Sequence, residues 1–302
     1  MDLDFARIEC EIIADTPVQL SASLYNALQN FEAQFKATCC PTLLKPCSSC
    51  SMQAGCPYRI VFGQKLSSDP EIVRLHQKPS LPFSLYINGM DGNTSSCTVG
   101  MVVIGSAVNH VEFFYTALLR MVEAAACIVL SPARCTLRSY SLDYQCVRHE
   151  ITSTACLPES LILLSGQHIL KNTVHSDSVI LSLKSPLRLL SNGSIAHRFD
   201  FGIFFRSQLR RCSSLCAYYG AGELDLDFAR LSEAAQNVAV FEDKTRYTQP
   251  PWSKRLNRAG LTGTTECSGL VEPMYSVLLL GSCFNAGKGA ALGLGYHQLE
   301  AQ

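Results

Sequence analysis

The sequence has no excess of charge of either sign and no long apolar run. Its 25 basic and 25 acidic side chains balance over 302 residues, so composition alone gives no argument for binding to nucleic acid or to a membrane, and any basic surface must be local. No run approaches the roughly 18 apolar residues that a membrane-spanning helix needs. The first residues, MDLDFARIEC, are acidic where a signal peptide carries lysine or arginine. We therefore expect a cytoplasmic protein without a membrane partner.

Charged residues are also few, at 17%, whereas apolar residues make up 47% of the chain. This composition is typical of a globular protein with a substantial core and excludes a disordered chain. The 15 cysteines are an odd number scattered along the sequence, unlike the disulfide framework of a secreted domain. Ten of them stand singly and are expected to be small buried hydrophobic residues, while five gather between residues 39 and 56.

Alternating strand and helix patterns run through the first half of the chain. Residues 3–13 alternate loosely and predict a strand, and leucines and phenylalanines at helical spacing in residues 20–35 predict an amphipathic helix. The resulting order, β-α-β-β-α-β, is that of a ferredoxin-like unit. Further strand patterns lie at residues 58–66, 82–87, 97–108 and 135–144, which is one strand more than the unit has, and its second helix is expected at residues 111–125, with Asn109 as a candidate cap.

The second half repeats this pattern. A strand at residues 178–190 breaks at SNGS, and the following helix ends at Gly220. We expect an α+β protein with two tandem ferredoxin-like (RRM-like) domains, residues 1–150 and 178–302, joined by a linker at 151–177. A cysteine-rich insertion, residues 39–56, interrupts the first domain. The remaining elements are expected to be helices at residues 199–220 and 226–236 and strands at residues 237–247, 272–281 and 296–300.

Four glycines stand close together near the end of the chain, in GSCFNAGKGAALGLGYHQLE (281–300). A P-loop is excluded, because the spacing G-x5-G-K-G is one residue too long and glycine stands where serine or threonine should hold magnesium. A dinucleotide-binding turn is excluded because no strand-turn-helix unit surrounds the glycines. Dense glycine either allows a phosphate backbone to approach the main chain or forms a tight turn before an edge strand.

This stretch resembles the carboxyl-terminal glycine-rich loop of the RAMP superfamily, and within it that of the CRISPR repeat-processing endoribonucleases. Four further segments resemble the same family in the same order: CCPTLLKPCSSCSMQAGCPYRIVF, SPLRLLSNG, FRSQLRRCSSLCAYYG and WSKRLNRAGLTG. The family fold, two ferredoxin-like domains, agrees with the fold that periodicity predicts independently.

The resemblance implies an endoribonuclease that binds the repeat stem-loop of precursor CRISPR RNA. Cleavage would be metal-independent: the ribose 2′-OH attacks the neighbouring phosphate and gives mature crRNA with a cyclic phosphate end, and no cofactor takes part. Other CRISPR effector-complex subunits are candidate partners. Two alternatives stay open, namely a RAMP subunit that holds the crRNA end without cutting it and a zinc-stabilised interaction protein without RNA.

This chemistry needs a base, an acid and a cation, and the resemblance suggests tyrosine, histidine and lysine. Tyr25 matches the tyrosine of the first helix in some relatives, but it also lies beside an apolar stripe. The family histidine is absent: the residues before the GK pair are Phe284 and Asn285. We therefore take His197, in a polar loop, as the acid–base candidate and Lys45 as the phosphate cation. Lys36 and His297 are further candidates.

RNA contacts are expected from two basic clusters and from the glycine stretch. One cluster lies on a predicted helix, and the other follows a tryptophan that could stack on a base. The glycine stretch would offer backbone N–H groups to a phosphate, with lysine as a cation. The alternative for the basic clusters is an ordinary solvated surface. The candidate RNA-binding residues are Arg206, Arg210, Arg211, Trp252, Lys254, Arg255, Arg258, Gly287, Lys288, Gly289, Gly293 and Gly295.

The cysteine cluster has the spacing of a metal site. Cys47 and Cys50 form a CxxC pair, and thiolates at this spacing can bind one ion from a single turn. A thioredoxin-like redox site does not fit, because CxxC there opens a helix and here lies among Ser, Pro and Gly. With Cys40 and Cys56 the set would close a tetrahedral structural zinc site, and Cys39 could replace Cys40. A metal is favoured over free thiols in a cytosolic protein.

Overall fold

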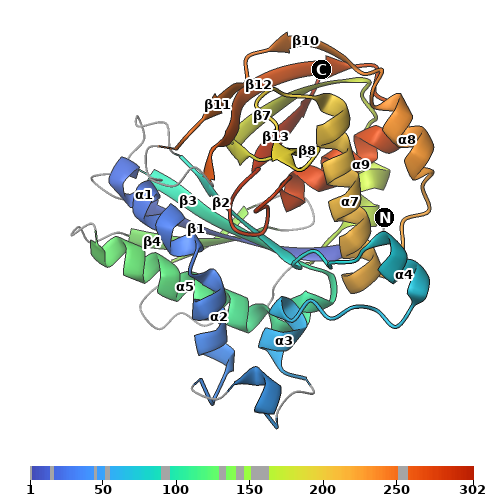
Figure 1. Ribbon diagram of the computed structural model, residues 1–302. Coiled ribbons are helices and arrows are strands. Elements are labelled where there is room, and N and C mark those ends of the chain that lie inside the picture. Colours follow the sequence, from blue (N-terminus) through green and yellow to red (C-terminus); the bar gives the residue numbers. More distant parts are fainter. Residues whose placement is uncertain are drawn as a thin grey trace.

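The structure is a computed structural model of the chain, and it describes residues 2–13, 17–43, 46–51, 55–89, 96–128, 134–140, 146–150, 163–250 and 258–302. Two antiparallel sheets, each covered by helices, make up most of it (Figure 1). Among these residues, no helix combines the length and the apolar character needed to cross a membrane.

The first sheet has the strand order of a ferredoxin-like domain, β2-β3-β1-β4. Neighbouring strands pair antiparallel, β5 extends the sheet beyond β4, and β6 pairs with the start of β1. Figure 1 shows α1, α2 and α5 along one side of this sheet. The bounds are β1 (Asp4–Ile13), α1 (Pro17–Leu28), α2 (Phe31–Cys39), β2 (Phe83–Asn88), β3 (Ser96–Ile104), α5 (Val111–Ile128), β4 (Arg134–Tyr140), β5 (Cys146–Glu150), β6 (Leu163–Ser165) and α6 (Gly166–Asn172).

The second sheet repeats this order as β10-β12-β7-β13, and β11 adds to β12. A small hairpin, β8 with β9, turns through Asn192 and Gly193, both at positive φ, as a tight hairpin turn requires. The bounds are β7 (Ser178–Leu187), β8 (Leu190–Ser191), β9 (Ser194–Ile195), α7 (Phe201–Tyr219), α8 (Phe228–Ala234), β10 (Ala239–Asp243), β11 (Arg246–Thr248), β12 (Gly260–Ser268), α9 (Glu272–Phe284) and β13 (His297–Ala301). Two tandem ferredoxin-like domains are therefore confirmed, while the residue boundaries between them stay a prediction.

Two predicted strands are wrong. Residues 58–66 contain α3 (Pro57–Phe62), a short helix with proline in its first turn, where the fixed φ of proline favours a helix. Residues 272–281 belong to α9, which buries Met274, Val277, Gly281 and Phe284 at helical spacing. The continuous apolar run SVLLLG hides that spacing, because such a run fits a buried strand equally well. The strand β12 was not predicted at all.

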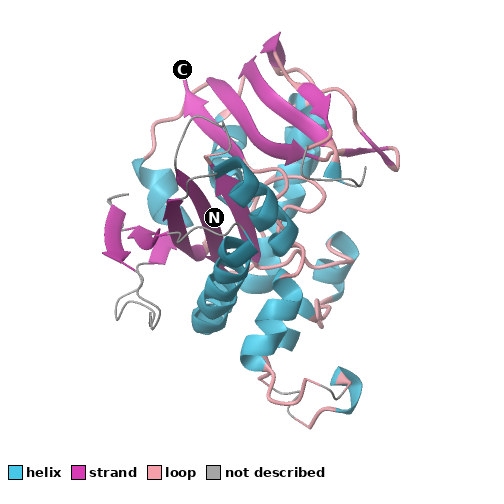
Figure 2. Ribbon diagram, turned by 90° about the vertical axis from the view of Figure 1, so that its left-hand side faces the viewer, coloured by secondary structure: helices cyan, strands magenta, loops and turns pink. Residues whose placement is uncertain are grey.

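Smaller differences concern where elements end. The predicted helix at residues 20–35 is two helices, separated at residues 29–30. The predicted strand at residues 97–108 stops at Ile104 and continues as the 3-10 helix η2 (Gly105–His110). Between α2 and β2 lie η1 (Cys47–Ser49), α3 and α4 (Pro70–Leu75). Figures 1 and 2 show the segment around η1 projecting away from both sheets.

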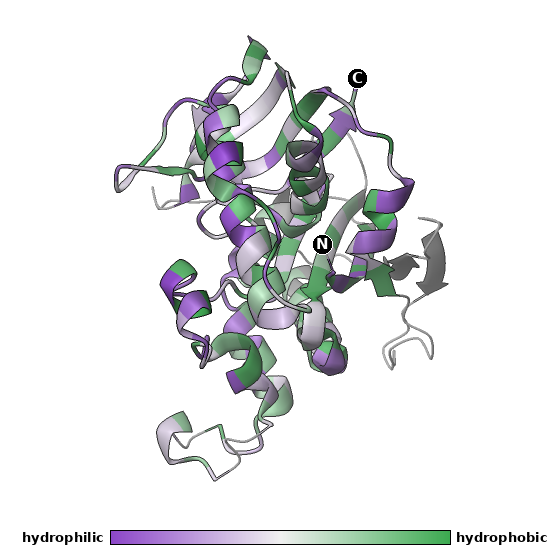
Figure 3. Cartoon of the chain, turned by 90° about the vertical axis from the view of Figure 1, so that its right-hand side faces the viewer, coloured by the Kyte–Doolittle hydropathy of each residue, from purple (hydrophilic) through white to green (hydrophobic). Residues whose placement is uncertain are grey.

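Each domain contributes residues to the hydrophobic core of the other. Leu3, Phe5 and Tyr86 of the first domain belong to the hydrophobic cluster of the second, and Ala291 of the second belongs to the cluster of the first. Phe5 meets Phe284 edge-on with ring centroids 5.3 Å apart. In Figure 3 hydrophilic and hydrophobic stretches alternate along the helices, as expected for amphipathic helices that cover a core. The interface is thus a packed surface that holds the domains in one arrangement.

Candidate nucleic-acid interface

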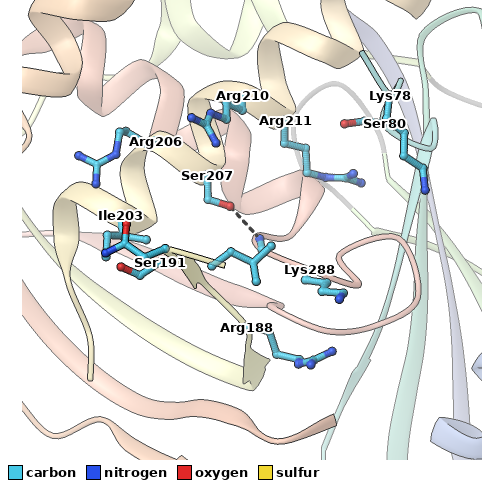
Figure 4. A pocket seen from close by; sticks show the side chains of 13 residues that line it. Lys78, Ser80, Arg188, Ser191, Ile203, Arg206, Ser207, Arg210, Arg211 and Lys288 are labelled. Atoms are coloured by element: carbon cyan, nitrogen blue, oxygen red, sulfur yellow. Dashed lines mark hydrogen bonds between the residues drawn. The ribbon is translucent and has the colours of Figure 1, made fainter. Parts of the chain in front are cut away.

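A cleft of about 700 Å³ lies between the two domains, and its lining is basic. Figure 4 shows it bounded by α7, the glycine stretch, the chain after β7 and a segment of the first domain. Polar groups add to the lining, and none of its described residues is acidic. We call this site the basic cleft. Its six cationic side chains are Lys78, Arg188, Arg206, Arg210, Arg211 and Lys288.

Helix α7 supplies one wall because its two faces differ. Asp200 caps the helix by accepting a hydrogen bond from the Ile203 amide at 2.8 Å. Arg206 and Arg210, four residues apart, share one face and line the cleft. The opposite face is buried in the core through Phe204, Phe205, Leu209 and Cys212. The predicted arginine cluster is therefore brought to one surface, with Arg210 exposed.

The glycine stretch forms the second wall as a closely packed loop. We call residues 285–296 the glycine loop. Its backbone N–H groups at Gly287, Lys288 and Gly295 already donate to Ser207 Oγ, the Arg188 carbonyl and the Pro186 carbonyl, at 3.2, 2.9 and 3.0 Å. These three groups are therefore occupied within the protein, whereas the Lys288 side chain is exposed at the cleft.

The four glycines are required by backbone conformation and by close approach. All four have φ between +66° and +90°, a region that side chains with a Cβ rarely adopt. A Cβ at Gly295 would lie 1.9 Å from the Ala286 carbonyl oxygen, and one at Gly293 would lie 2.5 Å from Leu28 Cδ1. Gly289 is exposed, whereas Gly293 and Gly295 are buried. The last two glycines thus serve packing.

The glycine loop docks on the first domain along the edge strand β2. The Leu85 amide donates to the Ala291 carbonyl at 3.1 Å, and Leu85 and Leu292 form a parallel bridge. The Asn285 side-chain amide donates to the carbonyls of Leu85 and Ala290 at 2.7 and 2.9 Å. The loop therefore belongs by sequence to the second domain and by contact to both.

Arg211 makes a contact that the sequence did not indicate. Its Nε donates to the Phe284 carbonyl at 2.7 Å, and its terminal nitrogen donates to the Phe83 carbonyl at 2.9 Å. The two carbonyls belong to different domains. Burial of the guanidinium lowers the pKa of Arg211 to about 10. Predicted as an RNA contact, this side chain lines the basic cleft but also ties the domains together.

Two of the three predicted catalytic residues lie in the described part of the chain, and both are outside the cleft lining. Tyr25 is 0% exposed in the core of the first domain, and burial raises its pKa. This placement favours the alternative reading as part of the apolar stripe. His197 is exposed and stacks on Tyr247, with ring centroids 4.0 Å apart. Lys45 lies outside the described residues.

The second basic cluster is described at one position only. Trp252, Lys254 and Arg255 lie outside the described residues. Arg258 donates to the Asn26 side-chain oxygen of α1 at 3.1 Å, so it too joins the two domains.

Two other candidates take part in packing. Lys36 lies over the ring of Tyr58, 5.2 Å from its centroid. His297 is 1% exposed: its Nδ1 lies 2.9 Å from the Gly295 carbonyl oxygen, and its Nε2 lies 2.9 Å from Gln208 Nε2. A neutral ring that donates through Nδ1 and accepts at Nε2 satisfies both contacts. Burial lowers the pKa of His297 to about 4.

Sequence reasoning missed two cations of the cleft. Arg188 follows β7 in the SPLRLLSNG segment, and its Nε is buried with no hydrogen-bond partner among the residues that the structure describes. Lys78 comes from the chain between α4 and β2. The family resemblance identified the segment that contains Arg188 but did not single out this arginine. The sequence around Lys78 has no feature that distinguishes it from an ordinary solvated lysine.

The cysteine-rich segment contains half-buried thiols. Cys39, Cys40, Cys47, Cys50 and Cys56 are all free and partly exposed. No group of three or more candidate metal ligands is assembled among the residues that the structure describes. Burial, and after it the charge of Cys56, raises the pKa of Cys39 to about 11.

Comparison with known proteins supports this organisation. Residues 181–297 match the family model described as CRISPR-associated endoribonuclease Cas6, and residues 3–144 match a model described as an N-terminal domain. No curated protein sequence matches the chain.

Several solved structures share the fold over the whole chain. Cas6 of Thermus thermophilus has a TM-score of 0.55 at 12% identity, over 99% of this chain and 100% of that chain. A Cas6 product complex has a TM-score of 0.54 at 14% identity, over 99% and 100%. A partial Cas6-RT-Cas1–Cas2 complex has a TM-score of 0.54 at 12% identity, over 100% of this chain and 46% of that chain.

Proposed function

We propose that this chain, whose residues 181–297 match the family model of the CRISPR-associated endoribonuclease Cas6, binds the repeat stem-loop of precursor CRISPR RNA in the basic cleft and cleaves it. One observation carries the proposal: among the described residues, six cationic side chains and no acidic one line a cleft bounded by the glycine loop. In a chain with zero net charge, this concentration of positive charge is local, as binding to a phosphate backbone requires.

The chemistry we propose is metal-independent attack of a ribose 2′-OH on the adjacent phosphate. Cations at the cleft stabilise the charge that develops on that phosphate, and Lys288, an exposed residue of the glycine loop that lines the cleft, is placed for this role. The assignments of Tyr25 and His197 to acid–base catalysis and of Lys45 as the phosphate cation remain proposals. Because Tyr25 has no exposed surface, it can contact RNA only if the segments that cover it move.

Incubation of the purified protein in EDTA with a labelled repeat RNA from its own genome tests the function. A second RNA carries a 2′-deoxy sugar at the cut site. We expect cleavage of the first RNA only, with a cyclic phosphate at the new end. Cleavage of both RNAs would rule out 2′-OH attack, and an absolute need for added metal would rule out the metal-independent reaction.

Removal of one cation tests the cleft itself. We expect Lys288→Gln to weaken repeat-RNA binding and to reduce the slope of log K against log salt by about 0.7 to 0.9, the contribution of one phosphate contact. The matched control is Lys244→Gln, an exposed lysine paired with Glu242 at 2.8 Å on the β10–β11 turn. Equal slopes for the two variants would remove Lys288 from the interface.

A subunit that holds crRNA without cutting it is the second candidate function. The sequence favours it, because Phe284 and Asn285 stand just before the GK pair, where the resemblance leads us to expect a histidine. Both residues are buried. No histidine is among the described residues that line the cleft. Tight binding of the repeat RNA without cleavage in the same assay would select this function.

We further propose that the protein works in the cytoplasm with other CRISPR proteins as partners, supported by its similarity to a Cas6-RT-Cas1–Cas2 complex. Co-purification of these proteins from the native host would test this.

A structural zinc ion held by the cysteine-rich segment is also proposed. Thiolates of Cys47, Cys50 and Cys56 would hold it together with Cys39 or Cys40. Such a metal would pin a loop that is too polar and short to pack itself.

A further inference from the structure

We infer that Arg211 is a positioning residue that couples RNA bound in the basic cleft to the docking of the glycine loop on the first domain. The inference rests on the proposed function and deepens it, because it says how one binding event sets the geometry of two domains. Arg211 is not assigned a contact with the reacting atoms.

The two carbonyls that Arg211 binds lie where the glycine loop begins and where its docking strand begins. Phe284 is the last residue of α9 and directly precedes Asn285, the first residue of the glycine loop. Phe83 is the first residue of β2, the strand on which the loop docks through Leu85. One planar group therefore fixes the start of the loop relative to the start of its docking strand.

The same guanidinium also faces the cleft. Arginine has five N–H donors in a rigid fork, and the two bonds to carbonyls use two of them. Arg211 lines the basic cleft beside Arg188 and Lys288, and Figure 4 shows it extending from α7 toward the segment that carries Ser80. The remaining donors are available to a phosphate on the cleft side.

Electrostatics link the two roles. Both hydrogen bonds of Arg211 run to neutral carbonyl oxygens, and no salt bridge from this guanidinium occurs among the residues described. Arg211 is partly buried. A cation withdrawn from water without an acidic partner is unfavourable, and a phosphate in the cleft would neutralise it. RNA binding should therefore strengthen the two hydrogen bonds by which Arg211 clamps the loop to the first domain. By thermodynamic reciprocity, these intact hydrogen bonds should favour RNA in the cleft.

Lysine cannot replace this arrangement. Its single ammonium group keeps the charge but lacks the fork that reaches two carbonyls at once. The Asn285 amide, which donates to the Leu85 and Ala290 carbonyls, provides a second bridge that keeps the loop folded when Arg211 is changed. Substitutions at Arg211 should thus loosen the docking without unfolding either domain.

The experiment compares Arg211→Lys and Arg211→Gln with Arg210→Gln and Arg230→Gln in the full chain. Arg210 is the exposed cleft arginine next to Arg211, and Arg230 lies on α8, outside the cleft lining. With the repeat RNA as probe, both the dissociation constant and the single-turnover rate at saturating protein are measured. Hydrogen exchange of the Leu85 amide is measured on the protein without RNA.

We expect both Arg211 variants to lower the saturating rate by about tenfold or more, because misplaced groups slow a reaction after binding. Arg210→Gln should act mainly on the dissociation constant, and Arg230→Gln should change neither quantity. The Leu85 amide should exchange faster in Arg211→Lys and Arg211→Gln than in the other two variants.

Arg211 variants that change only the dissociation constant, as Arg210→Gln does, would overturn the inference and leave Arg211 as a phosphate contact. Unchanged exchange at Leu85 would also overturn it. If the wild-type protein binds or cleaves no repeat RNA, the proposed function fails and the coupling to RNA fails with it. The exchange measurement then still decides whether Arg211 clamps the loop. If Arg211→Gln does not fold, Arg211→Lys carries the test.

Discussion

The glycine loop and the cysteine-rich segment are each rich in one residue type, but they differ in how far they are buried and in what they contact. The loop is enclosed: its residues Asn285, Ala286, Gly293 and Gly295 are buried, and its hydrogen bonds reach both domains. The cysteine-rich segment projects from the body of the protein (Figure 2) with its thiols partly exposed. Local enrichment in one residue type therefore indicates that a segment has an unusual role. Only the contacts of that segment in the structure show what holds it in place.

One pair of glycines isolates this difference. Gly295 in the loop and Gly55 in the cysteine-rich segment have similar φ values, +66° and +77°. A Cβ at Gly295 would meet the Ala286 carbonyl oxygen at 1.9 Å, whereas a Cβ at Gly55 would meet no atom of the described residues within 4 Å. Both glycines are needed for their positive φ, and of the two only Gly295 is also needed because a side chain would clash.

The largest effect is therefore expected from Gly295→Ala. The positive φ costs about 1 kcal/mol in either glycine when alanine replaces it, and the backbone clash adds to this at Gly295. We expect Gly295→Ala to lower the free energy of unfolding by about 3 kcal/mol or more and Gly55→Ala by about 1 kcal/mol. Denaturant unfolding of both variants measures the difference. Similar losses in the two would mean that the loop is no more constrained than the cysteine-rich segment.

Acid should loosen the loop before it affects the cysteine-rich segment, because His297 holds the Gly295 carbonyl. Burial lowers the pKa of His297 in the folded protein to about 4, below the value of about 6.5 for an unfolded chain. The unfolded state then binds more protons between these values, so stability is lost as pH falls through this window. The expected loss from this group is about 2 kcal/mol between pH 7.5 and pH 5.

Unfolding free energies of the wild type and of His297→Gln, measured across that pH range, check this expectation. The variant is less stable at neutral pH, because it loses the ring packed edge-on against Phe204, but its stability should change less with pH. Parallel pH profiles for the two proteins would show that His297 does not titrate with folding.

The repeated strand order was predictable because each ferredoxin-like unit has its own alternation of elements, confirmed in both sheets. Failures came where local pattern is ambiguous. The apolar run in α9 fits a helix or a strand, and β12, with its threonines and Gly263, has few apolar residues. Tertiary pairing between two neighbours, β7 and β10, decides that strand, and no local window contains this information.

The candidate site was predictable only in part, for the same reason. Arg206 and Arg210 follow from helical spacing and Lys288 from the glycine stretch. Lys78 reaches the cleft only through the packing of the domains, which sequence spacing does not report. The burial of Tyr25 beneath Gly293, whose Cβ position lies 3.7 Å from the tyrosine ring, likewise depends on the docked loop.

The smallest effect on overall stability is expected from removing the proposed zinc ion. Helix α3, which follows the cysteine-rich segment, packs on the first domain by itself, through contacts such as Tyr58 with Glu32 and Phe62 with Phe35. The ion would therefore order that segment and contribute little to the rest of the fold. We expect one zinc ion per chain in the wild type and none in Cys47→Ser/Cys50→Ser, with the unfolding free energy lower by about 1 kcal/mol or less.

The matched control is Cys283→Ser, a single cysteine at the end of α9 and outside the segment, which should keep its zinc. Hydrogen exchange should rise within residues 39–62 of the double variant and stay unchanged at the Leu85 amide, where the glycine loop docks. Loss of protection at both places would show that the two regions are coupled, which their separate contacts argue against. Zinc-free wild-type protein, purified without chelators, would instead make these cysteines free thiols and leave the segment ordered by its protein contacts alone.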